Sequence, residues 1–96
     1  MEPQVVILKQ RNERGWTYGR VGNRFFEAKV LDPGSDEGLD SGRVTRLAVC
    51  KTPEWNGHAI AFHYERGWGS STKMLPQTTD DIRDLQAVLV ALRDVA

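Results

Sequence analysis

Apolar and polar side chains alternate along much of this chain, and the alternation predicts β-strands. Between residues 16 and 31, the sequence WTYGRVGNRFFEAKVL contains two runs rich in aromatic and β-branched residues, which meet at Gly22-Asn23. A Gly-Asn pair suits a two-residue turn of type II′, because glycine adopts the positive φ needed at the first central position. The pattern therefore predicts a β-hairpin with strands at residues 16–21 and 24–31.

The two faces of the second hairpin strand differ in polarity. One face is purely apolar and consists of Phe26, Ala28 and Val30. The other face mixes charged and apolar groups and consists of Phe25, Glu27, Lys29 and Leu31. Successive side chains in a strand point to opposite faces of the sheet, so the apolar set is expected to lie in the core.

Three further strands and one helix are predicted outside the hairpin. The strands are expected at residues 5–10, 43–51 and 58–66, and Leu47 and Val49 are expected to point inward. A threonine cap followed by two acids, at residues 78–81, suits the start of a helix over residues 79–94. The apolar residues of this helix recur at helical spacing and form one stripe, Ile82, Leu85, Val88, Leu89 and Leu92.

This order of elements favours an α+β fold. We expect an antiparallel β-meander of four or five strands packed on one C-terminal amphipathic helix, as a single domain over residues 1–96. The helix stripe would cover one face of the sheet. The opposite face would carry Phe25, Leu31, Ala59, Ala61 and His63. Such a face either serves as a partner surface or is covered because the sheet curls over it.

Composition narrows the classes of protein to which the chain can belong. The 13 basic and 13 acidic residues cancel, so no overall charge favours nucleic acid or anionic lipid. Four acids nonetheless gather between residues 32 and 41. The single cysteine, Cys50, fits a reducing compartment. The N-terminus has no signal-peptide pattern, and no apolar run is long enough to cross a membrane. We expect a cytoplasmic protein with no membrane partner.

The sequence contains no arrangement typical of catalysis or of metal binding. His58 and His63 would point to opposite faces of one strand, so they cannot share a metal ion. Cys50 lacks the surroundings of a catalytic thiol and is expected to be buried. The acids between residues 32 and 41 do not have the spacing of a calcium loop. We therefore expect a protein that is not an enzyme and has no metal or cofactor.

The tetrapeptide Glu-Arg-Gly-Trp occurs twice, at residues 13–16 and 65–68. A glycine at a strand end allows a bulge or a left-handed turn that redirects the tryptophan after it. In one interpretation, Trp16 and Trp68 cap the ends of the sheet and cover edges of the core. In the other, the Arg-Trp pairs contact a partner, since Trp and Arg are enriched at binding hot spots.

The segment from residue 16 to residue 47 resembles a small family without known function, found mostly in bacteriophages, prophages and their bacterial hosts. The matching positions are Gly22, Phe26, Ala28-Lys29-Val30, Asp32, Gly34-Ser35, Gly38-Leu39, Gly42-Arg43-Val44 and Leu47. A later Tyr-Asp-Arg-Gly-Trp motif of the family is similar to residues 64–68, which have Glu in place of Asp. The acids at Asp36-Glu37 depart from the family pattern. The resemblance implies a phage or mobile-element origin and no particular activity.

Two functions are expected from these features. The first is a non-enzymatic interaction protein that binds a host or phage protein complex stoichiometrically, such as an anti-CRISPR-like inhibitor of a host defence complex. Its expected partner-binding residues are Arg66, Trp68, Asp36, Glu37 and Asp40. The alternative is a nucleic-acid-binding accessory protein that uses the basic, aromatic hairpin. Its expected contact residues are Trp16, Tyr18, Arg20 and Arg24.

Overall fold

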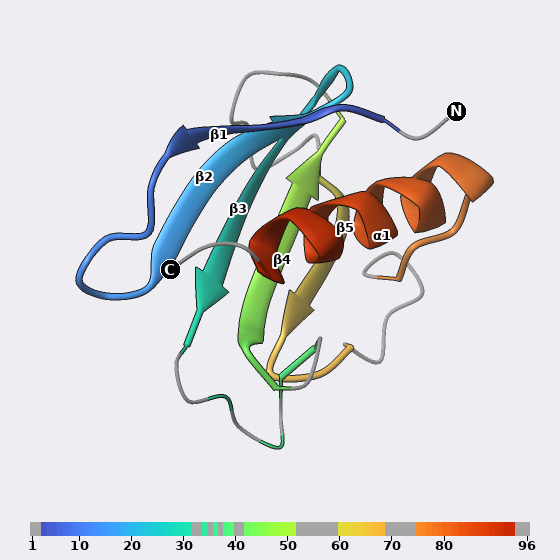
Figure 1. Ribbon diagram of the computed structural model, residues 1–96. Helices are drawn as coiled ribbons and strands as arrows, with labels where there is room; N and C mark the ends of the chain where they lie inside the picture. The colour runs from blue at the N-terminus through green and yellow to red at the C-terminus, as the bar shows by residue number, and fades with distance from the viewer. Residues whose placement is uncertain are drawn as a thin grey trace.

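The fold is a five-stranded antiparallel sheet with one helix across one face (Figure 1). The computed structural model describes residues 3–31, 34, 36, 38, 39, 42–51, 60–68 and 75–93. Its elements are β1 (Val5–Lys9), β2 (Trp16–Val21), β3 (Arg24–Val30), β4 (Val44–Cys50), β5 (Ile60–Glu65) and α1 (Thr79–Arg93). Neighbouring strands in the sheet follow chain order. The predicted α+β meander closed by a C-terminal helix is therefore confirmed.

The predicted element bounds agree closely with the structure. Within the described residues, each predicted strand or helix end lies within one residue of the observed end. The first two residues of the predicted strand 58–66 and the last residue of the predicted helix lie outside the described residues. The expected hairpin is the pairing of β2 with β3, in which Val21 lies opposite Arg24.

The turn of this hairpin has the expected backbone conformation. Gly22 has a φ of 58°, and within the described residues the one non-glycine residue with positive φ is Arg66. Asn23 therefore has a negative φ. A type I′ turn has a positive φ at both central positions and a type II′ turn at the first only, so this pattern fits type II′. This turn fixes the register of β2 on β3, so it also determines which side chains share a face.

The core lies between the sheet and α1, and it is built from cross-strand rows. One row consists of Gly19, Phe26, Val49 and Phe62, and the next consists of Thr17, Ala28, Leu47 and Tyr64. Phe26, Leu47, Val49 and Phe62 have no exposed surface, which confirms the predicted inward faces. A Cβ atom on Gly19 would lie 2.7 Å from the Phe26 ring. The glycine therefore lets this ring lie across β2.

The orientation of α1 differs from the prediction at its first turn. Val88 and Leu92 are fully buried, and Leu85 and Leu89 pack against the core, as the stripe predicted. Ile82 was expected in the same stripe, but 49% of its surface is exposed. Two acids, Asp81 and Asp84, take the sheet side of this turn and are buried.

Arg24 is the reason that these acids face the sheet. Its Nη1 atom donates to Asp81 Oδ1 at 2.7 Å and to Asp84 Oδ2 at 3.1 Å. Asp81 is also part of the helix cap: its backbone N–H donates to Thr78 Oγ1 at 3.0 Å, and its carboxylate accepts from the backbone N–H of Thr78 at 3.3 Å. This reciprocal pair has the geometry of a capping box. The Arg24–Asp81–Asp84 cluster thus attaches the start of α1 to the hairpin.

The two acids of the cluster respond differently to their surroundings. Burial acts to raise the pKa of Asp81, but hydrogen bonds from Gln77, Arg24 and Thr78 outweigh it and lower the pKa. Burial raises the pKa of Asp84, and the attraction of Arg24 does not offset it. A lowered pKa means that ionised Asp81 stabilises the fold until the pH falls through that pKa. A raised pKa means that ionisation of Asp84 weakens the fold as the pH rises through it.

We predict that Asp81→Asn destabilises the protein and that Asp84→Asn does not. Asp81→Asn should lower the free energy of unfolding at pH 7 by about 2 kcal/mol, less than the full effect of breaking a buried pair because Arg24 keeps Asp84. Asp84→Asn should change it by less than about 0.5 kcal/mol, like the exposed control Asp80→Asn. Urea unfolding followed by circular dichroism measures all three. An equal loss for Asp81→Asn and Asp84→Asn would contradict the assigned roles.

Candidate functional site

The candidate site lies on the sheet face opposite α1, where cross-strand pairing gathers polar and aromatic side chains. One row consists of Trp16, Lys29, Arg46 and Glu65, and the next consists of Tyr18, Glu27, Ala48 and His63. Arg20 follows on the same side of β2. Within the described ranges, no helix or strand crosses this face (Figure 1). We call the surface formed by these nine residues the open face.

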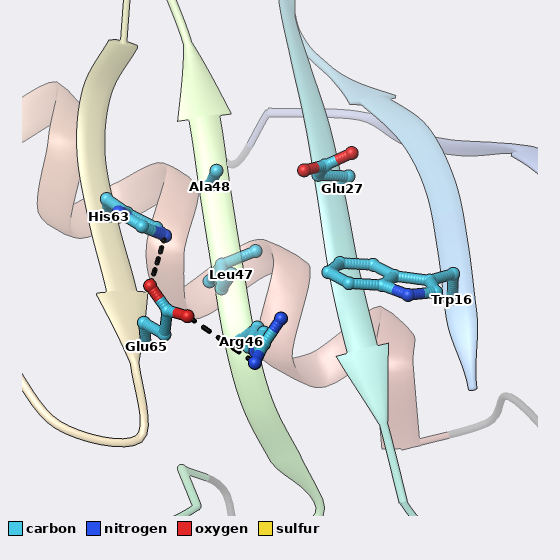
Figure 2. A pocket seen from close by; sticks show the side chains of 7 residues that line it. All are labelled: Trp16, Glu27, Arg46, Leu47, Ala48, His63 and Glu65. Atoms are coloured by element: carbon cyan, nitrogen blue, oxygen red, sulfur yellow. Dashed lines mark ion pairs between the residues drawn. The ribbon is translucent and has the colours of Figure 1, made fainter. Parts of the chain in front are cut away.

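A hollow of about 140 Å³ occupies the middle of the open face. Its lining residues are Trp16, Glu27, Arg46, Leu47, Ala48, His63 and Glu65. Figure 2 shows them with α1 behind the sheet and with the Trp16 ring extending from β2 over β3. Ala48 separates Glu27 from His63, and two strand spacings put their backbones about 10 Å apart. The small side chain of Ala48 therefore leaves room at the centre of the face.

The two carboxylates that line the hollow differ in their ion pairs. Glu65 lies between two basic groups, with its carboxylate oxygens 3.4 Å from Arg46 Nη2 and 4.0 Å from His63 Nε2 (Figure 2). Within the described part of the chain, Glu27 has neither an ion pair nor a hydrogen bond through its carboxylate. Burial raises the pKa of Glu27, and the positive charge of His63 acts in the opposite direction. Glu27 is thus a partly buried acid whose carboxylate lines the hollow without an ion pair or hydrogen bond among the described residues.

The β2 side of the open face is aromatic and basic. The Trp16 and Tyr18 rings stack with their centroids 6.5 Å apart and an interplanar angle of 25°. Lys9 Nζ lies 6.0 Å from the centre of the Tyr18 ring, within range of a cation–π contact. Arg20 is exposed beyond these rings. The structure therefore brings together three of the four residues predicted to contact nucleic acid.

The fourth of these residues, Arg24, lies on the other face of the sheet. Its side chain is held by Asp81 and Asp84 beneath the helix start. Arg20 and Arg24 lie close together in the sequence, on either side of the hairpin turn, but strand parity places their side chains on opposite faces of the sheet. Arg24 has a structural role in the observed fold and does not contribute to the open face.

The described residues among those predicted to bind a protein partner, Asp36, Arg66 and Trp68, lie outside the open face. Trp68 packs edge-on against Tyr64 on the α1 side, with the ring centroids 4.9 Å apart, so it covers an edge of the core. Arg66 is exposed in a left-handed backbone conformation with a φ of 54°. Asp36 is exposed, whereas Glu37 and Asp40 lie outside the described residues. The structure does not bring Trp68 onto the open face.

Sequence reasoning overlooked Glu27, Arg46, His63 and Glu65 as a group. Strand parity already placed each of them on the side away from the core. The cross-strand register, which puts Arg46 opposite Glu65 and Ala48 opposite His63, could not be derived from parity. Cys50 is buried as expected, and within the described residues no three His, Cys, Asp or Glu side chains are grouped to hold a metal ion.

Comparison with known families gives one match. A family model described as a domain of unknown function, DUF7678, matches residues 15–93, which include β2–β5 and α1. The chain belongs to the DUF7678 family. Comparisons with curated proteins and with solved structures gave no significant match. Membership in DUF7678 agrees with the expected family without a known function, and the expected phage origin stays a prediction. In the described part of this DUF7678 domain, no helix is long and apolar enough to span a bilayer.

We predict that the Glu27 carboxyl of this DUF7678 domain titrates above its ordinary value of 4.5. His63→Gln should raise the Glu27 pKa further, because the protonated imidazole favours the ionised carboxylate. The exposed control Arg83→Gln, on α1, should leave it unchanged. Carbon-detected NMR of the glutamate side chains measures these values. A Glu27 pKa at or below 4.5, or one insensitive to His63→Gln, would show that the hollow is more solvated than its geometry indicates.

Proposed function

We propose that this DUF7678 protein is a non-enzymatic interaction protein that binds a protein partner stoichiometrically through the open face. We propose further that it has a phage or mobile-element origin and acts in the host cytoplasm as an inhibitor of a defence complex, for example a CRISPR effector. The observation that carries the binding proposal is the hollow beside Trp16, which has charges of both signs around it.

The side chains of the open face suit contact with a protein. Trp, Tyr and Arg are the residue types most enriched at binding hot spots, and the face presents Trp16, Tyr18, Arg20 and Arg46. The five-stranded sheet holds them on hydrogen-bonded strands, so little loop ordering is needed on association. The hollow contains both carboxylates and a guanidinium group. These charges complement a polypeptide, which has charges of both signs, better than they complement a nucleic acid, whose phosphates are all negative.

The proposal of an anti-defence role is supported by sequence resemblance alone. The Gly-Arg-Val and Glu-Arg-Gly-Trp segments resemble a family found mostly in phages and prophages, where small stoichiometric inhibitors of host defence are an advantage. The open face supports binding of a protein, whereas the choice of a defence complex as the partner is supported by the resemblance. The defence role therefore needs a test that is separate from the test of the surface.

We predict that Trp16→Ala weakens capture of the partner. Tagged wild-type protein should retain a host protein at a fixed molar ratio, and Trp16→Ala should raise the dissociation constant about 30-fold, or about 2 kcal/mol, through loss of a desolvated aromatic anchor. The matched control Gln86→Ala, on the outer side of α1, should bind normally. Biolayer interferometry with the captured protein measures both. Failure to retain any partner, together with no protection of phage in an infection assay, would refute the proposal.

A second candidate function is binding of single-stranded nucleic acid. It is favoured by one specific observation, the stacked rings of Trp16 and Tyr18 beside Lys9 and Arg20. Base stacking on aromatic rings, combined with basic groups that contact phosphates, is the usual chemistry of single-strand binding. Glu27 lies directly opposite Tyr18 and would repel a phosphate chain that follows these rings. This candidate therefore stands second.

If the second candidate is correct, affinity for a labelled single-stranded oligonucleotide should depend strongly on salt. Fluorescence anisotropy should show at least about tenfold weaker binding at 200 mM than at 50 mM salt, because phosphate contacts release counterions. Arg20→Gln should weaken binding, and Arg24→Gln should be avoided because it disturbs the fold. The exposed control Arg83→Gln should have no effect. No binding at 50 mM salt would remove this candidate.

A further inference from the structure

We propose that the hollow in the open face is a receptor for one arginine side chain of the protein partner. The inference rests on the proposed function and specifies the chemistry that the partner must present. It is carried by three observations about the lining residues: an acid without an ion pair or hydrogen bond among the described residues, an aromatic ring beside it, and a floor formed by a small side chain.

The charged groups that line the hollow would bind one additional cation favourably. Glu65 is already placed between Arg46 and His63, at 3.4 Å and 4.0 Å. Glu27, in the same hollow, has no ion pair or hydrogen bond through its carboxylate within the described residues, although the charge of His63 acts on this carboxylate. Apart from His63, the lining contains two carboxylates and one guanidinium, which together have a net charge of −1. A cation from outside would neutralise it, and the open side of Glu27 is where that cation would bind.

The shape and the aromatic ring favour arginine over lysine. The Trp16 ring forms one wall of the hollow and Ala48 lies between Glu27 and His63. A planar guanidinium can stack on an indole ring and donate two parallel hydrogen bonds to one carboxylate, whereas an ammonium group is a compact, strongly hydrated charge. A hollow of about 140 Å³ accommodates one side chain and not a folded segment.

Fold stability does not account for an acid at position 27. Burial raises the pKa of Glu27, so the ionised carboxylate opposes folding as the pH rises through that pKa. A neutral isostere should therefore be tolerated at pH 7 as well as Glu27 or better. This expectation separates a binding role from a structural role, because the same substitution should keep stability and abolish recognition of the cation.

The test uses N-acetyl-arginine methylamide as the probe and two-dimensional NMR of the full chain as the readout. The Trp16 indole N–H signal should shift saturably in the millimolar range of probe concentration. Glu27→Gln should weaken binding at least about tenfold, as loss of a hydrogen bond to a charged group does, without lowering the melting temperature. Glu13→Gln, which removes an exposed acid outside the hollow, is the matched control and should bind normally.

Two analogues of the probe test whether binding depends on the charge and the shape of the guanidinium group. The citrulline analogue, which has the shape of arginine without its charge, should bind at least about tenfold more weakly, and the lysine analogue should bind more weakly than arginine. Equal binding of arginine and citrulline, or unchanged binding by Glu27→Gln, would overturn the inference. If the arginine probe fails but Trp16→Ala still loses the captured protein, the proposed function stands and the receptor assignment falls. If the probe binds and no protein partner is found, the hollow is a receptor for an arginine side chain and the proposed function falls.

Discussion

The placement of α1 depends on the contact between Arg24 and the two acids at the helix start. The helix alone has a weakly amphipathic pattern, in which Ile82 competes with Asp81 and Asp84 for the side facing the sheet. Burial of Ile82 would favour one rotation of the helix, and the ion pairs at 2.7 and 3.1 Å favour another. The second rotation is the one observed, because burying the two acids without Arg24 would leave uncompensated charges near the core. The same contact connects the hairpin turn to the helix cap, so one side chain helps to set the rotation of α1 on the apolar face of the sheet.

Once that face is covered, strand parity determines the chemistry of the other. β3 shows this within a few residues, because Phe26 and Ala28 enter the core while Glu27 and Lys29 reach the open face. Two small residues then shape the two sides. Gly19 lets the Phe26 ring cross β2 on the helix side. Ala48 leaves the hollow on the open side. The open face is therefore a direct result of closing the core.

Local features of the sequence were enough to predict the elements, and long-range features were not. The hairpin, the inward faces of β3 and β4 and the threonine cap depend on neighbours within a few residues, and each was predicted correctly. Ala61 was expected on the face opposite the helix, but it belongs to the core cluster. The rotation of α1 depends on a contact between residues 57 positions apart, and helical periodicity placed Ile82 wrongly. The hollow needs the register of three strand pairs, which parity does not supply. Trp68 was predicted to contact a partner, but the strand before it supplies Tyr64 as its packing partner.

Glu27 bears most directly on the choice between a protein and a nucleic acid as the partner. It lies opposite Tyr18 in the row that crosses the middle of the open face, so a strand of nucleic acid stacked on Trp16 and Tyr18 would bring phosphates towards its carboxylate. Repulsion between them would be strongest where burial has removed water, because screening is weakest there. An arginine from a protein would use the same ring and the same carboxylate with attraction in place of repulsion. Glu27 therefore weakens binding of a nucleic acid and strengthens binding of a protein that presents an arginine. An interface can gain specificity in this way without additional contacts.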